Sequence, residues 1–285
     1  MRILGAGDNI VDCYVDLGLL FPGGNAVNVA VAARRSGADA AYVGVLGDDE
    51  AGRLIMEALR SEGVGTECTR VAHGSNAWVE IHRHSGDRVF GASSLGVSPF
   101  RLNDEELAYA AEFDTVHLCA GGFLEEDVPA VAEVSAVSFD FKVRRERDYV
   151  DALLPHAEIA FFSASDLNES SSIALLERAT RLGARMAIAT RGPLDALAFD
   201  GRHLWRQAPL AREVIDTLGA GDSFIGRFIV GYRAGEDLAT TLHAAAEAAA
   251  ATCAVYGAFG HGRPYRDIGG TKSVQAPSVT AEPSP

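Results

Sequence analysis

Cysteine is scarce in this chain, and the few cysteines do not cluster. The 285 residues include only Cys13, Cys68, Cys119 and Cys253, which lie far apart in the sequence. A zinc knot or a disulfide framework needs cysteines in close pairs. The spacing therefore excludes both kinds of site and predicts reduced thiols, most of them buried.

A surplus of basic residues and a long apolar run are also missing. Lys and Arg total 25 against 39 Asp and Glu, a formal net charge of −14, whereas proteins that bind a nucleic-acid duplex cluster Arg and Lys on one face. No window reaches the ~20 apolar residues that a membrane span needs, and Asp8 and Asp12 interrupt any signal-peptide core. We therefore expect a cytoplasmic protein that binds neither nucleic acid nor membrane.

What is present is typical of a globular α/β protein. Hydrophobic residues make up 48% of the chain and charged residues 22%, so a sizeable core can form, and the length leaves room for one large domain. Apolar runs alternate with amphipathic ones, which predicts a mostly parallel sheet with helices on both faces. Strands are predicted at 2–7, 40–44, 115–119, 137–141, 159–162 and 186–190, and helices at 26–36, 49–62 and 173–182.

One region breaks this alternation. Residues 77–90 alternate polar and apolar side chains around a turn at 85–87, which predicts a β-hairpin with one polar face. Residues 11–20 are predicted to be one extended stretch that joins the hairpin in a small sheet, like a lid. The polar face of the hairpin contains Glu80, His82 and His84.

The strongest chemical signal is the string D-T-L-G-A-G-D at 216–222, which follows a strand-like run at 213–215 and opens an apolar helix that extends to about Tyr232. Glycines allow successive backbone N–H groups to converge without interference from a Cβ. The helix dipole adds partial positive charge at the same point. The string therefore predicts a cradle for an oxyanion, here a phosphoryl group in transfer.

Asp222 ends that string and is the candidate catalytic base. A carboxylate beside the cradle could accept the proton of an attacking hydroxyl while the N–H groups stabilise charge on the phosphate. The alternative is a simple helix N-cap, since Asp is favoured there.

A second string, G-G-N-A-V-N-V-A at 23–30, offers two asparagines on one side of a helix start. Their amides both donate and accept hydrogen bonds, which suits the hydroxyls of a polyol; the alternative is an Asn cap after a flexible loop. Asp8 and Asp12 follow the first strand. If the extended conformation continues, they share a face at the strand end where open α/β sheets bind ligands.

These two strings, in this order, resemble the signatures of the PfkB family of ribokinase-like carbohydrate kinases. The resemblance covers about residues 1–262 and implies a ribokinase-like α/β fold, a doubly covered, mostly parallel sheet with a small β lid. It implies a kinase domain over 1–270, lid segments at about 11–22 and 74–98, and a tail at 271–285 whose Ser, Thr and Pro content predicts disorder. Segments 7–9, 87–91 and 205–209 are most similar to the bacterial fructoselysine 6-kinases.

The resemblance also implies roles for individual residues. Asp222 would be the base, Gly219, Ala220 and Gly221 the anion hole, and Asp8, Asp12, Gly24, Asn25 and Asn28 the sugar contacts. Thr190, Gly192, Thr217, Gly219 and Gly221 would line the nucleotide site. Ser163 and Asp166 stand where the family often has an N-x-x-E motif tied to magnesium, and Asp195 replaces a glycine near the Thr190 turn.

The expected reaction is phosphoryl transfer from ATP with Mg²⁺ to O6 of fructoselysine or a related fructosamine; dependence on a monovalent cation such as K⁺ is left open. Arg88 and the polar lid face would bind the amino-acid part of that substrate. The alternatives are another sugar or nucleoside kinase of the same family, or a catalytically silent sugar-binding regulator. A homodimer through the lid is a further expectation.

Overall fold

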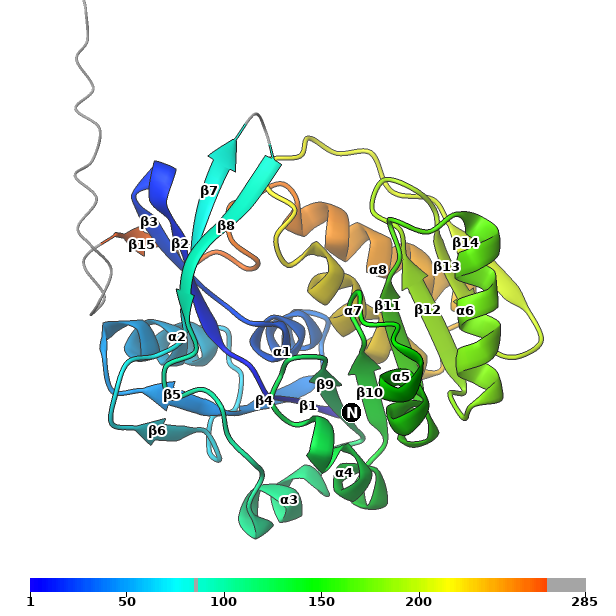
Figure 1. The fold of residues 1–285 in the computed structure, drawn as a ribbon, viewed down its shortest axis with the longest axis horizontal. Coiled ribbons are helices and arrows are strands. Elements are labelled where there is room, and N and C mark those ends of the chain that lie inside the picture. The colour runs from blue at the N-terminus through cyan, green and yellow to red at the C-terminus, as the bar shows by residue number, and fades with distance from the viewer. Residues whose placement is uncertain (85–86, 266–285) are drawn as a thin grey trace, which may run out of the picture.

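A central sheet of eight strands runs in the order β14-β13-β12-β11-β10-β9-β1-β4 (Figure 1). The computed structural model describes the backbone of residues 1–84 and 87–265 and the side chains of 1–82 and 89–265. The six strands from β4 to β12 are parallel, whereas β13 and β14 pair antiparallel at the other edge. The strands are β1 (Arg2–Ala6), β4 (Asp39–Val43), β9 (Thr115–Cys119), β10 (Val137–Asp140), β11 (Ile159–Ser163), β12 (Met186–Thr190), β13 (Ala196–Phe199) and β14 (Leu204–Gln207).

Helices cover both faces of this sheet, because the strands are apolar on both sides. Phe162 packs with one helix layer, whereas its neighbour Phe161 packs with the other. The first layer contains α3 (Asp104–Ala110), α4 (Val128–Val134), α5 (Arg147–Leu153) and α6 (Glu169–Arg181). The second contains α1 (Asn25–Arg35), α7 (Ala220–Ala234) and α8 (Leu238–Thr252). None of the helices that the structure describes is long and apolar enough to cross a bilayer.

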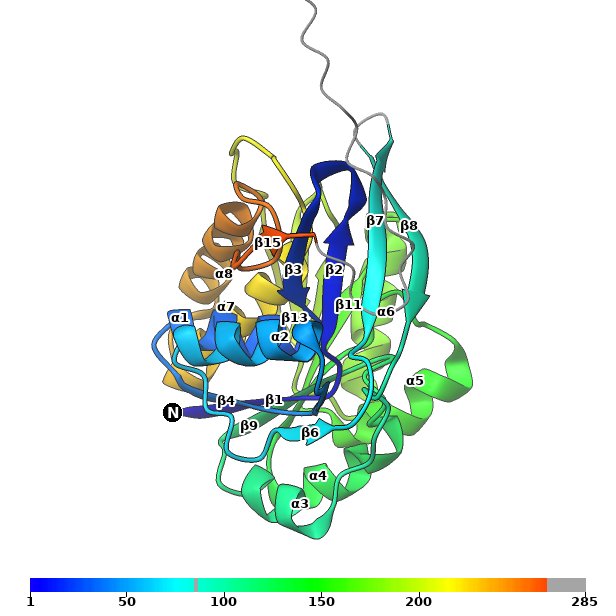
Figure 2. The same cartoon turned by 90° about the vertical axis from the view of Figure 1, so that its left-hand side faces the viewer.

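A second, five-stranded sheet stands beside the first in the order β15-β3-β2-β7-β8 (Figure 2). It is the lid that the sequence predicts, and its base packs on α2 (Glu50–Ser61). Its strands are β2 (Ile10–Tyr14), β3 (Leu19–Gly23), β7 (Trp78–His84), β8 (Asp87–Ser94) and β15 (Arg263–Pro264); a two-stranded sheet of β5 (Val45–Gly47) and β6 (Arg70–Ala72) lies below. The ribokinase-like fold class is confirmed, whereas the predicted tail, 271–285, lies outside the described residues.

Two local predictions were wrong. Residues 11–20 are not one extended stretch: β2 and β3 are joined by a 3₁₀ turn (Val15–Leu17) that closes at Gly18 with φ +63°, a conformation that glycine adopts without steric cost. Residues 213–215 do not form a strand, and Val214 is 61% exposed. The chain must return there from the edge strand β14 to α7, which packs against α1, so these residues form a crossing loop.

Candidate active site

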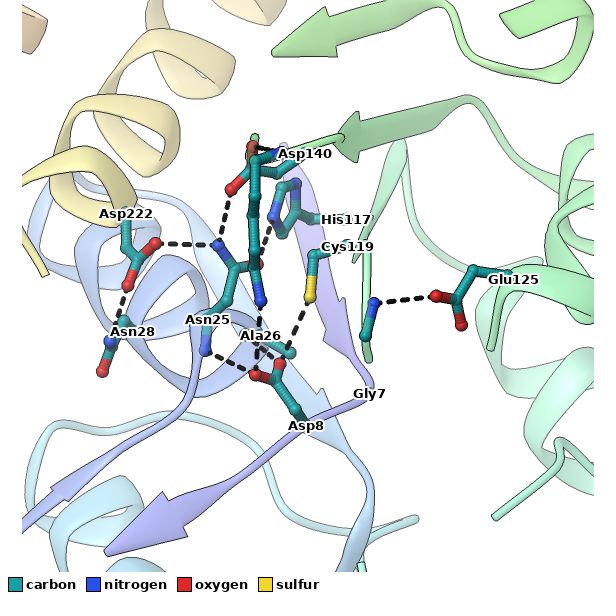
Figure 3. A network of polar contacts seen from close by, with 12 residues as sticks. Gly7, Asp8, Asn25, Ala26, Asn28, His117, Cys119, Glu125, Asp140 and Asp222 are labelled. Atoms are coloured by element: carbon teal, nitrogen blue, oxygen red, sulfur yellow. Dashed lines mark hydrogen bonds and ion pairs between the residues drawn. The ribbon is translucent and has the colours of Figure 1, made fainter. Parts of the chain in front are cut away.

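The candidate site lies at the carboxyl edge of the parallel strands, where the N-terminal ends of α1 and α7 meet β9 and β10 (Figure 3). Helix α7 begins after Gly219, whose φ of +74° is in the left-handed region. A Cβ at this position would lie 2.2 Å from the Cβ of Ala258. Glycine is therefore required here both by the backbone turn and by the close packing.

The first turn of α7 presents unpaired donors. Within the described part of the chain, no acceptor meets the N–H groups of Gly219, Gly221 and Asp222. Every helix start leaves such groups open, and here they belong to the same turn as the Asp222 carboxylate. Of the cradle predicted from residues 219–221, the Ala220 N–H donates to the Thr217 carbonyl at 3.3 Å, so the open donors are those of Gly219 and Gly221, next to that of Asp222.

Asp222 lies in this first turn without capping the helix, since the N-cap position belongs to Gly219 and has no side-chain hydrogen bond. Instead its carboxylate accepts two amide donors from α1: Asn25 Nδ2 lies 2.7 Å from Oδ1, and Asn28 Nδ2 lies 2.7 Å from Oδ2. Burial raises the pKa of Asp222, while the bond from Asn28 and the charge of Lys142 oppose the rise. The simple N-cap alternative is therefore wrong for Asp222.

The two asparagines lie together as expected, but both already donate to a carboxylate of the protein. Asn25 Nδ2 also lies 3.0 Å from Asp140 Oδ2, so both of its N–H bonds point at carboxylates. The Oδ1 atom of Asn28 is buried and has no partner among the described residues, which leaves one acceptor for a hydroxyl. Gly24 precedes α1 with φ +108°, and a Cβ there would lie 2.6 Å from Asn9 Cα.

Asp8 caps α1 from outside the helix. Its carboxylate accepts the N–H groups of Asn25 and Ala26, both at 3.1 Å, and the thiol of Cys119 at 3.4 Å. Strand β1 ends at Ala6 and the chain turns at Gly7, where φ is +133°. Asp8 and Asp12 were expected to share a strand face only if the extended chain continued beyond β1. The chain does not continue in this way.

Asp12 belongs to the lid strand β2 and is 4% exposed. A Cβ at Gly23, on the neighbouring strand, would lie 2.3 Å from Asp12 Oδ2. The glycine of the second string is therefore needed so that this carboxylate can approach the backbone of β3.

Sequence reasoning missed Asp140 and Lys142. Asp140 ends β10 at the same edge, and burial raises its pKa to about 7, although Lys142 lowers it. The Lys142 ammonium lies 3.9 Å from Asp8 Oδ2. Burial lowers the pKa of Lys142, but Cys119, Asp8 and Asp140 raise it more, so the net shift is upward. The rule that ligands bind at carboxyl ends of parallel strands could have pointed to both residues.

His117 was missed because it lies inside a strand. It is fully buried on β9 and lies 3.0 Å from Asn25 Oδ1 through Nε2. Burial lowers the pKa of His117 to about 3, so the ring is neutral at physiological pH. Its sequence context, between Val116 and Leu118, has no signal that distinguishes it from a core residue.

Comparison with known proteins settles the family. The model of the pfkB family carbohydrate kinases matches residues 18–261, which is most of the chain. The chain belongs to the pfkB family of carbohydrate kinases. The family membership predicted from the two glycine-containing strings is confirmed.

Individual relatives agree with this assignment. The chain is 40% identical over 271 residues to the fructosamine kinase FrlD of Bacillus subtilis, covering 93% of this chain and 95% of that protein. It is 37% identical to the fructoselysine 6-kinase of Escherichia coli, covering 89% and 97%. A structure of Arabidopsis thaliana ribokinase complexed with ribose and ATP superposes with a TM-score of 0.77 at 19% identity, covering 90% and 94%. A putative ribokinase II from E. coli, in complex with ATP and Mg²⁺, gives 0.76 at 19%, covering 90% and 94%; both show the shared fold.

The residues expected to line the nucleotide site of this pfkB enzyme lie along the same sheet edge. Thr190 ends β12 and its hydroxyl donates to the Phe162 carbonyl at 3.4 Å, while Gly192 turns the chain with φ +61°. Thr217 is exposed in the loop before α7. Arg191, between Thr190 and Gly192, is buried and its Nε has no partner among the described residues.

The two expected magnesium ligands are engaged elsewhere. Asp166 accepts Arg145 Nη1 at 2.9 Å and Nη2 at 2.7 Å, and the Ser163 carbonyl accepts the same Nη2 at 3.1 Å. Among the side chains that the structure describes, those of residues 1–82 and 89–265, no group of three or more His, Cys, Asp and Glu could hold a metal ion. These residues therefore do not fit a metal site made by protein ligands alone.

The lid directs its polar strand face away from Asp222. Cys13 is the register partner of Glu80 and packs with the cluster that contains α2, whereas Tyr14, on the opposite face, donates a hydrogen bond to Asp216 in the signature string. Because strand side chains alternate, Glu80 and His82 share with Cys13 the strand face that packs toward α2. That this polar face binds the substrate stays a prediction, with Glu80 and His82 on the face opposite to Tyr14. The side chains of His84 and Arg88 lie outside the described residues.

Proposed function

We propose that this pfkB-family kinase transfers the γ-phosphoryl group of ATP to O6 of fructoselysine or a closely related fructosamine. The observation that carries the proposal is the Asp222 carboxylate, held by two amide donors beside the open N–H groups at the start of α7. The named relatives that act on fructosamines support the choice of acceptor.

In this reaction the hydroxyl oxygen attacks the γ-phosphorus, its proton passes to Asp222, and the oxygen between the β- and γ-phosphorus atoms leaves with ADP. The N–H groups of Gly219 and Gly221 stabilise negative charge on the phosphoryl oxygens. A carboxylate with a raised pKa is a stronger base, provided that it stays deprotonated. Magnesium would neutralise phosphate charge, and Mg²⁺ usually binds through substrate phosphates rather than in an all-protein cage.

The charge of the site favours a cationic acceptor over a plain ketose. Asp140 and Asp222 accept from the same Asn25 amide group, and Asp8 lies nearby. Lys142 is the cation that acts on all three carboxylates. The secondary ammonium lies on C1, at the other end of the sugar from O6, so this excess negative charge would attract it at a distance rather than through a direct hydrogen bond.

Product analysis tests the reaction. The protein is incubated with MgATP and fructoselysine, and phosphorus NMR coupled to the sugar protons identifies the ester formed. We expect a phosphate at O6, and none with Asp222→Asn. A product from fructose, ribose or adenosine but not from fructoselysine would identify another kinase of the family. ATP that is never consumed with any acceptor would favour the silent regulator.

Three further expectations accompany the proposal. We propose a cytoplasmic location, where ATP and reduced thiols coexist; all four cysteines are free.

We also propose a homodimer through the lid, because the edge strand β8 exposes 50% of Val89 and 61% of Phe90. Sedimentation of Phe90→Ser as a monomer would support the dimer, and a monomeric parent protein would exclude it. Exchanging K⁺ for a bulky organic cation in the assay tests monovalent-ion dependence.

A further inference from the structure

A row of buried polar side chains leads from the middle of the central sheet to Asp222 (Figure 3). His117 on β9 and Ser138 on β10 are register partners, and both are 0% exposed. Ser138 Oγ lies 3.0 Å from His117 Nδ1, and His117 Nε2 lies 3.0 Å from Asn25 Oδ1. Buried polar groups are costly unless they are hydrogen-bonded, so packing alone gives no reason for them here.

The donors and acceptors fix the direction of every bond in this row. The ionised Asp222 carboxylate can only accept, so the Asn25 atom 2.7 Å away must be the NH₂ nitrogen. The carbonyl oxygen of the same amide then faces His117, which must carry its proton on Nε2. The bare Nδ1 atom is left to accept the hydroxyl proton of Ser138.

We propose that His117 and Ser138 are positioning residues that hold the Asn25 amide in one of its two orientations, with both N–H bonds directed at Asp222 and Asp140. The proposal rests on the role of Asp222 as the base. An amide turned by half a revolution would place its oxygen against two carboxylates. His117 opposes that turn, because with its proton on Nε2 the turned amide would place N–H bonds against an N–H donor.

The consequence concerns the protonation of the base. A hydrogen bond from Asn25 stabilises the charged form of Asp222, as does the bond from Asn28. The other ionisable groups around it are Asp8 before β2, Cys119 on β9, and Asp140 and Lys142 at the end of β10. Losing the Asn25 donor would raise the pKa of Asp222 further, and the acid limb of the kcat profile would move to higher pH.

Three variants separate positioning from packing. His117→Phe fills similar space without a donor, His117→Gln keeps an N–H near the place of Nε2, and Ser138→Ala removes only the hydroxyl. We expect His117→Phe to lower kcat by about 10- to 100-fold, to move the acid limb upward, and to leave the KM for ATP unchanged. His117→Gln should recover most of kcat, and Ser138→Ala should fall between them. If His117→Phe and His117→Gln lose equal amounts of kcat and keep the pH profile of the parent protein, the buried polar side chains contribute only packing, and the proposal is overturned.

A measurement without substrate keeps this test apart from the proposed function. Long-range ¹H–¹⁵N spectra of the intact protein report which ring nitrogen of His117 carries the proton, and the signal is assigned by its absence in His117→Gln. We expect Nε2–H in the parent protein and a mixture of tautomers in Ser138→Ala. A proton on Nδ1 in the parent would overturn the proposal whatever the acceptor proves to be. Failure to phosphorylate any fructosamine would leave the tautomer result unchanged and count only against the proposed function.

Discussion

Alanine at position 219 would bring a Cβ to 2.2 Å from the Cβ of Ala258 and 2.7 Å from its Cα. The backbone there has φ +74°, and holding an L-residue in that region costs about 1–2 kcal/mol. Overpacking a close contact adds about 1–3 kcal/mol. Gly219→Ala should therefore destabilise the fold by about 2–5 kcal/mol.

For a chain of 285 residues that loss corresponds to a fall in Tm of roughly 3–8 °C, by the usual scaling of Tm with unfolding entropy. Calorimetry measures the fall. Relief of the contact must also move the first turn of α7 away from the loop that contains Ala258. The N–H groups beside Asp222 would shift with it, and a displacement near 1 Å can reduce kcat by about 100-fold.

Gly221→Ala is the matched control. A Cβ at Gly221 meets nothing within 4 Å, and its φ is not positive. Because alanine is the better helix former by about 0.5–1 kcal/mol, the Tm should stay unchanged or rise slightly. Adding Ala258→Gly to Gly219→Ala removes the contact with Cβ but leaves the contact with Cα, so recovery should be partial. A Gly219→Ala protein with the parent Tm and kcat would refute the reasoning.

Three other predictions follow from the site. Asp222→Asn should lower kcat by at least ~10²-fold with little change in Tm. Because the reaction needs the deprotonated base, whose pKa is raised, the kcat of the parent protein should fall with falling pH at a pH above the pKa of an ordinary aspartate. A fall in kcat only at the pKa of an ordinary aspartate would contradict this. Asn28→Ala and Asp12→Ala should each weaken acceptor binding by about 1–3 kcal/mol while ATP affinity stays constant. An equal loss of ATP affinity in calorimetry would show that these residues bind the nucleotide instead. Tyr14→Phe removes a hydroxyl donor to the buried Asp216 carboxylate, which also accepts the N–H groups of Leu218 and Gly257. The free energy of unfolding should fall by about 1–3 kcal/mol. An unchanged midpoint of denaturant unfolding would show that the bond contributes nothing to stability.

Local pattern was sufficient for the parallel strands and for helices such as α2, whereas the short helices α3, α4 and α5 were not predicted. Helix α2 begins after the N-cap Asp49 and has an apolar face that includes Leu54 and Ile55, so both its start and its buried side follow from residues close in sequence. The cradle before α7 was also predictable, because its glycines and its aspartate are adjacent in the chain.

The contacts of the site needed information from distant segments. Asp8 could not be assigned as a cap of α1 because seventeen positions separate it from Asn25, and the turn at Gly7 is set by tertiary packing. The inner face of the lid could not be chosen either, since alternation gives two faces without saying which one meets Asp216. His117 acquires its role only when β9 lies under the start of α1.

The central claim is that this kinase phosphorylates a fructosamine, and kcat/KM compared across acceptors at saturating MgATP tests it most directly. Fructoselysine should exceed fructose, ribose and adenosine by at least ~100-fold, because a site that pairs buried charges rejects substrates that leave those charges unpaired. Equal or better turnover of any plain sugar, or turnover of none of the four, would contradict the claim about the acceptor.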